Sequence, residues 1–460
     1  MKNLINQFCN AAIVCCFVCA AFGVDAQIVN IPDANFKAAL VSGLCKDTNN
    51  DGIGDANVDT NGDGEIQVSE AVAVTSLIVS NKNITDFTPI RFFNRLQYLD
   101  CRFNQITSLN TNGLPSLAYL YCSNNQLTSL NVLGAPGLIS LYCDNNQLSN
   151  LNVQNMSNLY YLHCNYNSLG SLNVQNLNNL EELECEHNQL SALNVQGLNK
   201  LRSLCLSYNQ LTSLNVQGLR SLIYCVVYNN QISTLNIQGL TTLQYLYCGI
   251  NKLISLDVQS LTKLQYFDCH TNSLSSLNVQ GLNDLIWFDC RQNQLTTLNV
   301  ETVNNLHDLF CNRNPIQCLS PLPNSLLHLN TDTTNITCLP NYPLSLTQGS
   351  GATLPICQAG NTNNCYVATT NAAASANAAL RVSPNPMHDA TTFELTDTSA
   401  LGSANTATLV VYNALGQAVR TVSFEGNKCT FTRDALPAGC YFYSVQLGAE
   451  VLNKGKLVIE

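Results

Sequence analysis

One 21-residue stretch decides the fold: Leu117-Ala-Tyr-Leu120-Tyr-Cys122-Ser-Asn-Asn125-Gln-Leu127-Thr-Ser-Leu130-Asn-Val-Leu-Gly-Ala-Pro-Gly137. The same pattern starts again at Leu138, and eleven consecutive units begin with leucines 21 residues apart, from Leu96 to Leu306. A fixed period of this kind is the sequence signature of a solenoid. One such coil cannot bury its own apolar face, whereas stacked coils bury theirs against one another.

The beginning of each unit predicts a short strand with one buried face. Counted from the first leucine as offset zero, most units read L-x-x-L-x-C, in which the buried side chains alternate with period two. Offset eight is asparagine in all eleven units, from Asn104 to Asn314. An amide at that turn can satisfy backbone groups of its own coil and of the neighbouring coil. We therefore expect a mainly β solenoid with a parallel sheet and few helices.

The cysteines follow the repeat. The chain has 22 of them, and two units carry Leu206 and Val227 where nine carry cysteine at offset five. This exchange identifies an apolar core position, in which a free thiol packs as a small hydrophobic group. Because the side chains point in parallel, relaxed disulfides between neighbours are disfavoured, although disulfides or a metal ladder remain the alternative. The nine cysteines are Cys101, Cys122, Cys143, Cys164, Cys185, Cys248, Cys269, Cys290 and Cys311.

Disulfides are expected after the array instead. Cys318 and Cys338 both fall at offset twelve of adjacent coils, which places them well to pair. Cys357 and Cys365 flank a polar loop and form the second expected pair. Cys205 lies at offset four, where the side chain should face solvent, and is the candidate reactive thiol.

The pattern L-x-x-L-x-C-x-x-N-x-L resembles the leucine-rich-repeat signature, with cysteine often at a position usually held by leucine. The resemblance covers residues 74–345. It implies a right-handed horseshoe or arc with the parallel sheet on the concave side, used as a binding scaffold.

Offsets two and four of each strand point away from the core, onto the expected concave face. Phe, Tyr or Trp occupies 11 of these 22 positions, against 7% of the whole chain. Tyr and Trp are enriched in interfaces and also suit stacking on sugar rings. The alternative is that aromatic residues simply fit exposed strand positions and pack along the ladder. The candidate ligand-binding residues are Tyr98, Tyr119, Tyr121, Tyr142, Tyr161, Tyr224, Tyr245, Tyr247, Tyr266 and Trp287.

An acidic patch interrupts these aromatic positions in the middle of the array. It consists of Glu181, Glu182, Glu184 and Glu186. The patch would suit a basic partner, but a solvated face is the simpler interpretation.

Two acidic loops at residues 47–70 precede the repeats. The second fits the twelve-residue EF-hand loop throughout, with glycine at position six and a bidentate glutamate at position twelve. Its expected calcium ligands are Asp59, Asn61, Asp63, the carbonyl of Glu65, Gln67 and Glu70. The first loop starts in the same way with Asp47, Asn49, Asp51 and Asp55, but its twelfth position is Val58. It resembles the tandem loops of dockerin or thrombospondin type 3 modules. We expect structural Ca²⁺ in an N-terminal cap over residues 27–92, with an unfilled acidic turn as the alternative.

The two ends of the chain predict export. Lys2 and an apolar run at residues 11–24 precede Val24-Asp25-Ala26. That run is too short for a bilayer span of about 20 residues, which favours a signal peptide over residues 1–26, with a retained membrane anchor as the alternative. Residues 346–380 are expected to be a linker, and 381–460 a small antiparallel β-sandwich.

Four motifs in the last segment resemble the type A sorting domain of the type IX secretion system. This resemblance implies a Gram-negative member of the Bacteroidota, passage across the outer membrane, and a secreted or surface-attached product. The motifs are Pro384-Asn-Pro386, Tyr412-Asn-Ala-Leu-Gly416-Gln, Leu436-Pro-Ala-Gly439-Cys-Tyr441 and Gly455-Lys-Leu-Val-Ile459.

These features predict a non-catalytic exported binding scaffold that presents an aromatic concave sheet to a protein or glycan ligand. Twenty basic against 30 acidic residues, a net charge of −10, argue against nucleic acid as a partner. We expect no membrane span in the mature chain, and a monomer. The alternative function is a structural or ice-facing surface protein that uses its convex face, where asparagine recurs at offset fourteen.

Overall fold

The computed structural model describes residues 27–357, 380–395, 406–413, 417–447 and 450–460. The expected signal peptide, Cys365 and most of the expected linker lie outside these residues. The chain divides into two compact units, Met1–Ala368 and Thr369–Glu460. Within the described residues, no helix is both long and apolar enough to cross a membrane.

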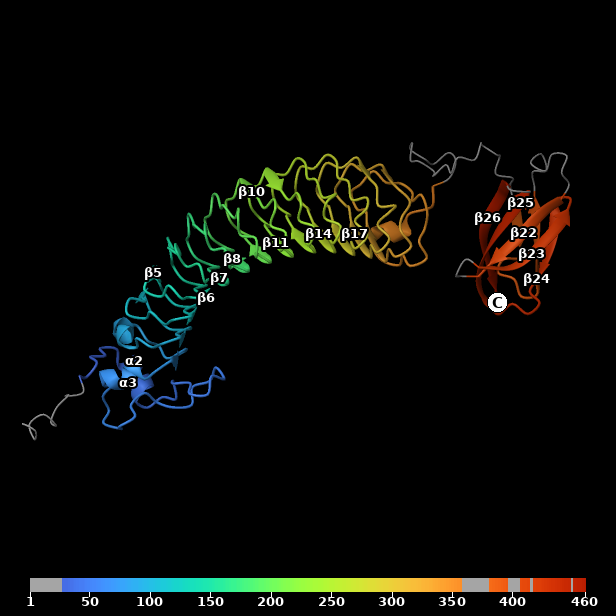
Figure 1. Ribbon diagram of the computed structural model, residues 1–460. Helices are drawn as coiled ribbons and strands as arrows, with labels where there is room; N and C mark the ends of the chain where they lie inside the picture. Colours follow the sequence, from blue (N-terminus) through green and yellow to red (C-terminus); the bar gives the residue numbers. More distant parts are fainter. Residues whose placement is uncertain (1–26, 358–379, 396–405, 414–416, 448–449) are drawn as a thin grey trace, which may run out of the picture. The chain divides into compact units, whose positions relative to one another are not determined.

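The first unit is the expected solenoid, built around one parallel sheet of thirteen strands. Each strand pairs in register with the next coil, so that Tyr224 lies opposite Tyr245 and Val226 opposite Tyr247. Figure 1 shows these strands side by side along the inner side of a curved stack of coils. The sheet is therefore on the concave face, as the resemblance to leucine-rich repeats implies. Its strands are β1 (Ser76–Ile78), β2 (Tyr98–Asp100), β4 (Tyr119–Tyr121), β6 (Ser140–Tyr142), β7 (Tyr161–His163), β8 (Glu182–Glu184), β9 (Ser203–Cys205), β11 (Tyr224–Val226), β13 (Tyr245–Tyr247), β14 (Tyr266–Asp268), β15 (Trp287–Asp289), β17 (Asp308–Phe310) and β19 (His328–Asn330).

The opposite side of the coils carries short strands that pair only in twos (Figure 1). Elsewhere this side is made of turns. The back therefore has little regular structure, because each coil is too short to return through a helix. The pairs are β3 (Ser108–Asn110) with β5 (Ser129–Asn131), β10 (Ser213–Asn215) with β12 (Thr234–Asn236), and β16 (Thr297–Leu298) with β18 (Cys318–Leu319).

The core contains the leucines and thiols that the repeat predicts. All nine cysteines at offset five are fully buried, and none forms a disulfide, which confirms the expected ladder of free thiols. Several donate from sulfur to the next strand, as Cys143 Sγ does to the carbonyl of His163 at 3.4 Å. In the middle of the ladder, Cys164 Sγ and Cys185 Sγ are 3.1 Å apart. The thiols thus fill the same positions that Leu206 and Val227 fill in their own coils.

The asparagines at offset eight connect each coil to the preceding one. Asn209 Nδ2 donates to the carbonyls of Cys185, one coil back, at 2.8 Å and of Leu206, in its own coil, at 3.1 Å. Its Oδ1 accepts from the backbone N–H of Leu190 at 2.9 Å. The pattern recurs from Asn125 to Asn314. These buried amides satisfy backbone groups that would otherwise lack partners at the turn.

The N-terminal cap covers the first coil with two helices and a 3₁₀ turn, α2 (Ala34–Val41), α3 (Val68–Val72) and η1 (Thr88–Phe92). Asp33 fastens the cap to the solenoid. Its Oδ1 accepts from the N–H of Phe36 at the start of α2 at 2.8 Å. Its Oδ2 accepts from both the N–H and the hydroxyl of Thr85, each at 2.7 Å.

The C-terminal end of the solenoid differs from the expected linker. Gln348 bridges to His328 in β19, and Ile356 bridges to Leu339, so residues 346–357 form a further coil. This coil includes the 3₁₀ helix η2 (Ser350–Thr353).

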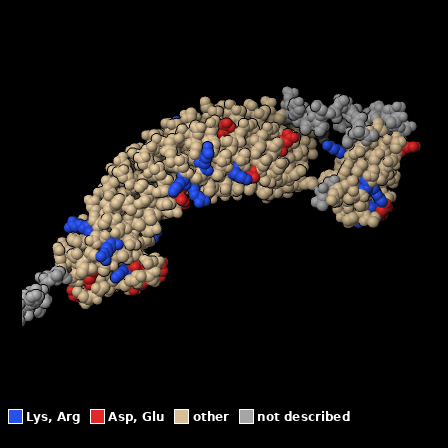
Figure 2. Space-filling model, viewed as in Figure 1, with Lys and Arg blue, Asp and Glu red and all other residues tan. Residues whose placement is uncertain are grey.

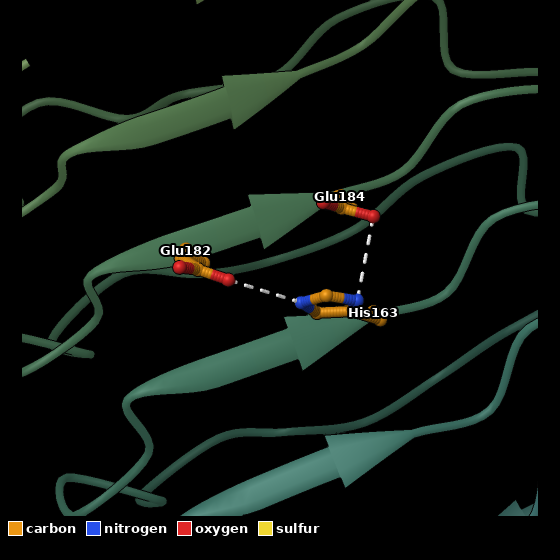
Figure 3. Close-up of side chains that lie close together, drawn as sticks. All are labelled: His163, Glu182 and Glu184. Carbon is orange, nitrogen blue, oxygen red and sulfur yellow. Dashed lines mark ion pairs between the residues drawn. The ribbon is translucent and has the colours of Figure 1, made fainter. Parts of the chain in front are cut away.

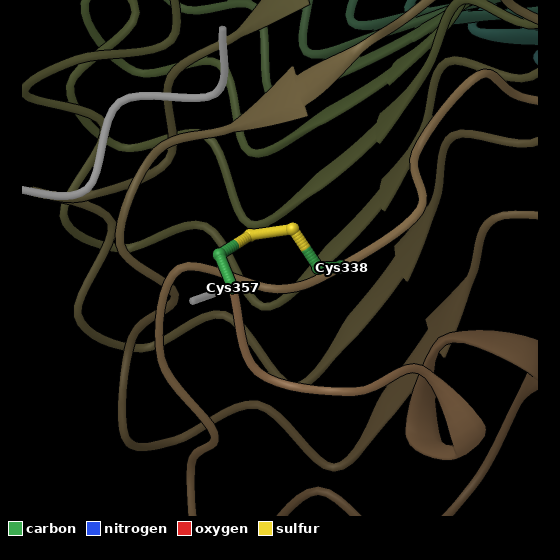
Figure 4. The surroundings of a disulfide bond; sticks show 2 residues. All are labelled: Cys338 and Cys357. Atoms are coloured by element: carbon green, nitrogen blue, oxygen red, sulfur yellow. A yellow bond between two sulfur atoms is a disulfide. The ribbon is translucent and has the colours of Figure 1, made fainter. Parts of the chain in front are cut away.

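Cys338 forms a disulfide with Cys357, with 4.9 Å between their Cα atoms (Figure 4). The expected pairing of Cys338 with Cys318 is therefore wrong, as is that of Cys357 with Cys365. Cys318 is itself disulfide-bonded. The pairing could not be assigned from spacing, because Cys318, Cys338 and Cys357 follow one another at intervals of 20 and 19 residues on successive coils.

The second unit is an antiparallel β domain of two sheets, as the alternating sequence of this segment predicts. The three-stranded sheet has the order β20 (Leu380–Ser383), β21 (Ala390–Leu395), β24 (Lys428–Thr432). The four-stranded sheet has the order β23 (Ala418–Glu425), β22 (Thr406–Tyr412), β25 (Gly439–Leu447), β26 (Glu450–Ile459). In the core of this domain, the Phe393 ring contacts both Phe431 and Tyr443 edge to face.

Candidate functional site

The aromatic side chains at offsets two and four form two stacked groups on the concave sheet. The N-terminal aromatic group consists of Tyr98, Tyr119, Tyr121 and Tyr142, with Tyr121 and Tyr142 stacked at 4.9 Å between ring centroids. Tyr224 and Tyr245 stack at 4.3 Å, and Tyr245 and Tyr266 at 5.1 Å. All these rings are half-buried or exposed. The C-terminal aromatic group comprises Tyr224, Tyr245, Tyr247, Tyr266, Trp287 and Phe310.

Contacts between neighbouring rings hold them in fixed positions, and each ring remains at least partly exposed. Tyr119 contacts Tyr98 and is still 37% exposed. Tyr224 stacks on Tyr245 and is still 43% exposed. Burial raises the pKa of Tyr142 to about 12, so its hydroxyl remains a neutral donor and acceptor at physiological pH. The surface can therefore offer flat apolar rings with polar rims, the combination found in interface cores.

Polar and ionisable groups separate the two aromatic groups. His163 in β7 lies opposite Glu184 in β8, and Glu184 lies opposite Cys205 in β9. Figure 3 shows Glu182 and Glu184 at opposite ends of the His163 ring. The distances are 3.5 Å from Nε2 to Glu182 and 3.3 Å from Nδ1 to Glu184. Tyr161, a candidate ligand-binding residue, lies beside Glu182 in the sheet, at this polar centre and outside both aromatic groups.

A second histidine cluster lies farther along the same sheet. Asp268 contacts His270 through a short carboxylate–imidazole pair, and Asp289 is almost fully buried beside them. Burial raises the pKa of Asp289 to about 6, although hydrogen bonding and charge from Arg291 act in the opposite direction. A Cβ atom at Gly249 would come within 2.5 Å of the His270 ring, so this cluster requires glycine in the preceding coil.

Sequence reasoning missed a third row of half-buried or exposed side chains, at offset seven, where the chain leaves the sheet. The backbone φ is positive at this position in all eleven coils, even at Ile250 and Thr271. Such φ values are unusual for β-branched residues. Tyr166, His187 and Tyr208 stack there with centroid distances of 4.2 and 4.1 Å. The signal was present as three ring-bearing residues 21 positions apart, but the outward direction of the turn could not be inferred from alternation.

The two acidic loops have nearly the same backbone conformation. Asp59 accepts from the N–H groups of Gly62 at 2.7 Å and Gly64 at 2.9 Å. In the first loop, Asp47 accepts from Asn50 at 2.7 Å and Gly52 at 3.1 Å. Each first-position carboxylate thus folds the loop around itself.

The remaining expected ligands of the second loop lie around this turn. Asn61 Nδ2 is 3.0 Å from both Asp63 Oδ2 and Gln67 Oε1. The Oε1 of Glu70 accepts from the N–H of Thr60 at 2.7 Å, across the loop. Val58 at the closing position of the first loop is buried, so only the second loop has an oxygen ligand there.

Charge is sparse over the solenoid. Figure 2 shows few Lys, Arg, Asp or Glu side chains on the visible face of the coils, and Asp and Glu gathered near the N-terminal end, where the acidic loops lie.

Comparison with known proteins identifies the C-terminal segment by family. Residues 381–460 match the family model of the secretion system C-terminal sorting domain. This match covers the second β unit and implies secretion or attachment at the cell surface. No curated protein matches the chain.

Solved structures resemble the solenoid. The functional domain of InlJ from Listeria monocytogenes, which includes a cysteine ladder, has a TM-score of 0.62 and 24% identity, covering 94% of this chain and 98% of that one. A leucine-rich-repeat protein of Leptospira interrogans has a TM-score of 0.52 and 24% identity. The leucine-rich effector YopM from Yersinia pestis has a TM-score of 0.52 and 23% identity. Each of these two covers 61% of this chain and 85% of its own. At these identities the likeness establishes a leucine-rich-repeat fold.

Proposed function

We propose that this protein is an exported, non-catalytic binding scaffold whose concave sheet captures a protein or glycan ligand. The observation that carries the proposal is the pair of stacked aromatic groups on one continuous parallel sheet. The sorting domain at residues 381–460 supports export, and the leucine-rich-repeat fold is commonly used for binding.

Preorganisation explains why these rings suit capture. Tyr224, Tyr245 and Tyr266 stand on strands whose register is fixed by backbone pairing, and each ring is held by its neighbour. Little side-chain entropy remains to be lost when a ligand packs on them. Although Tyr224 stacks on Tyr245, 43% of its surface remains exposed and accessible to a ligand.

The proposed ligand contact can be tested by removing the C-terminal aromatic group. Changing Tyr224, Tyr245, Tyr266 and Trp287 together to alanine is expected to weaken capture of a ligand found on glycan and protein arrays by at least about 100-fold. Each lost aromatic contact of this kind is worth about 1–2 kcal/mol. Affinity would be measured by surface plasmon resonance on the full chain.

A matched variant alters aromatic rings outside the concave sheet. Changing Tyr166 and Tyr208 to alanine removes two exposed rings at the turn and should leave the affinity within about twofold. Unchanged affinity in the fourfold variant, with its thermal unfolding still cooperative, would refute the proposed contact surface.

The thiol closest to this surface is poorly suited to nucleophilic catalysis. Burial, together with the charges of the nearby Glu184 and Glu186, raises the pKa of Cys205 to about 12. A thiol of this kind is protonated at neutral pH, whereas the nucleophile is the thiolate. The sequence-based suggestion that Cys205 is reactive is therefore not retained, and the proposed function includes no reaction.

The convex face is a weaker candidate for the functional surface. Its offset-fourteen asparagines are engaged in their own turns, as Asn173 Oδ1 accepts from the N–H of Gln175 and Asn194 Oδ1 from that of Gln196, both at 3.0 Å. These amides therefore have a local structural role. This arrangement favours ligand capture on the sheet over an ordered polar lattice on the back.

We also propose that Ca²⁺ stabilises the N-terminal cap through the second acidic loop. Carboxylate, amide and backbone oxygens are the ligands that Ca²⁺ takes, and Asp59, Asn61, Asp63, Gln67 and Glu70 converge on one turn. The carbonyl of Glu65 would complete the set. Asp47, Asn49, Asp51 and Asp55 would form a weaker site, because the first loop lacks a closing carboxylate.

Removal of calcium is expected to lower the melting temperature of the cap by at least about 3 °C. An ion at 100 times its dissociation constant stabilises the folded state by about 2.7 kcal/mol. Thermal unfolding would be followed by circular dichroism with Ca²⁺ and then with a chelator. The variant Asp63→Asn should lose this response, whereas Asp51→Asn should retain most of it. An unchanged melting temperature in the parent chain would exclude structural calcium.

A further inference from the structure

Both nitrogens of the His163 ring face a carboxylate on the neighbouring strand (Figure 3). Nε2 is 3.5 Å from Glu182 Oε2, and Nδ1 is 3.3 Å from Glu184 Oε2. The ring is held in place by Tyr142, whose centroid is 4.2 Å away. The three side chains come from β7 and β8, which pair in register, so the rigid sheet sets their spacing.

Among the described residues, the carboxylates of this arrangement form ion pairs with histidine alone. A neutral imidazole has one donor nitrogen and one acceptor nitrogen, so at least one nitrogen would present a lone pair to a carboxylate. Nε2 is fully buried and has no hydrogen-bond partner among the described residues. Within the same residues, no Lys or Arg lies within ion-pair distance of Glu182 or Glu184.

The second histidine cluster shows how the same sheet neutralises such a group. Arg291 Nε pairs with Asp289 at 3.2 Å, and the His270 ring pairs with Asp268. That cluster contains its own cation. The cluster at His163 has no equivalent of Arg291, although its two carboxylates are half-buried, with side-chain exposures of 40% and 31%.

We propose that His163, Glu182 and Glu184 form a binding site for a divalent transition-metal ion of the zinc class at the centre of the concave face. One ligand atom from each residue lies within 4.8 Å of the others. Two ligands of a tetrahedral ion with bonds of about 2.0–2.1 Å are about 3.3–3.4 Å apart. The 3.3 Å between His163 Nδ1 and Glu184 Oε2 matches that spacing for one ring nitrogen and one carboxylate. Imidazole with carboxylates is a donor set that suits Zn²⁺.

The surroundings support this assignment. Asn165 Nδ2 donates to Glu184 Oε2 at 2.9 Å, an outer contact of the kind that orients a metal-ligating carboxylate. When one ring nitrogen of His163 binds the ion, the other can donate to the remaining carboxylate oxygen. Three protein ligands leave a fourth position for water or for a donor atom of a bound partner. The site lies between the two aromatic groups, yet it does not depend on the proposed ligand capture.

The test is zinc binding by the full chain after chelator treatment, measured calorimetrically with excess Ca²⁺ present to occupy the acidic loops. One equivalent of Zn²⁺ should bind, and His163→Gln and Glu182→Gln should each weaken it by at least about tenfold. Substitution with Co²⁺ should give the absorption of a tetrahedral site. The metal-free variants should still unfold cooperatively, as the metal-free parent does, which shows that the loss of zinc binding is not a loss of folding.

The variant His270→Gln provides the matched control, because it alters the other histidine cluster on the same sheet. It should bind Zn²⁺ as the parent does. Binding that survives His163→Gln and Glu182→Gln, or that is lost in His270→Gln, would overturn the proposal. The absence of any zinc binding by the folded parent would overturn it as well.

Discussion

Replacing Asn209 with leucine is expected to lower the free energy of unfolding by about 3–5 kcal/mol, although the two side chains have the same number of heavy atoms and the same branching. Asn209 is 8% exposed, and its amide contacts the carbonyls of Cys185 and Leu206 and the N–H of Leu190. Leucine cannot replace these hydrogen bonds. Each buried backbone group left without a partner costs about 1–3 kcal/mol. Denaturant unfolding monitored by circular dichroism would measure the loss.

The neighbouring Gln210 gives the control. Its side chain is exposed in the same turn, so Gln210→Leu should change stability by no more than about 0.5 kcal/mol. If the free energy of unfolding of Asn209→Leu were within about 1 kcal/mol of the parent's, the asparagines would have to be regarded as turn formers only. Their bonds to the preceding coil would then contribute little to cohesion of the stack.

The parts of the fold that could be predicted from sequence are those determined by contacts between adjacent coils. The strand at the start of each unit follows from alternation, and the invariant Asn column follows from backbone groups that recur at each turn. The substitution of Leu206 and Val227 for cysteine was enough to identify a buried position. The strand and the asparagine recur in all eleven units, so the pattern itself carries the information.

The features that could not be predicted occur at single places in the chain and are not repeated from coil to coil. Cys338 had a cysteine on the coil at either side, and spacing could not show that it bonds Cys357. The glutamates near His163 were recognised as an acidic patch, but their approach to both ring nitrogens depends on rotamers. Likewise, only the structure shows that Arg291 pairs with Asp289 in one histidine cluster and that no described Lys or Arg pairs with the carboxylates of the other.

Raising the pH above about 9 is expected to unfold the solenoid cooperatively. Burial raises the pKa of nine core thiols above the ordinary value, to about 12 for Cys225 and Cys311. An unfolded thiol releases its proton near pH 8.5. The folded state therefore binds more protons above that pH. The stabilisation is complete below the unfolded value and is lost as the pH rises toward the folded value. The nine are Cys101, Cys122, Cys143, Cys185, Cys225, Cys248, Cys269, Cys290 and Cys311.

The size of this effect follows from the number of thiols. Each protonated core thiol favours unfolding by about 1.4 kcal/mol per pH unit above the unfolded pKa. At one pH unit above the unfolded pKa, nine thiols together lower the free energy of unfolding by on the order of 10 kcal/mol. This loss is comparable to the whole stability of a typical domain. Anaerobic pH titration followed by circular dichroism should therefore show a steep transition that begins before most tyrosines ionise near pH 10.

The steepness of the transition distinguishes thiol ionisation from general alkaline damage. Because Val227 occupies the offset-five position in its own coil, valine is expected to fit in place of Cys248, Cys269 and Cys290. This threefold variant should release about three fewer protons on unfolding and should unfold at a higher pH. A midpoint that does not move, or thiols that titrate while the chain remains folded, would show that the ladder does not hold its protons by burial. A shift in the expected direction would tie the stability of the whole stack to the protonation of its thiol core.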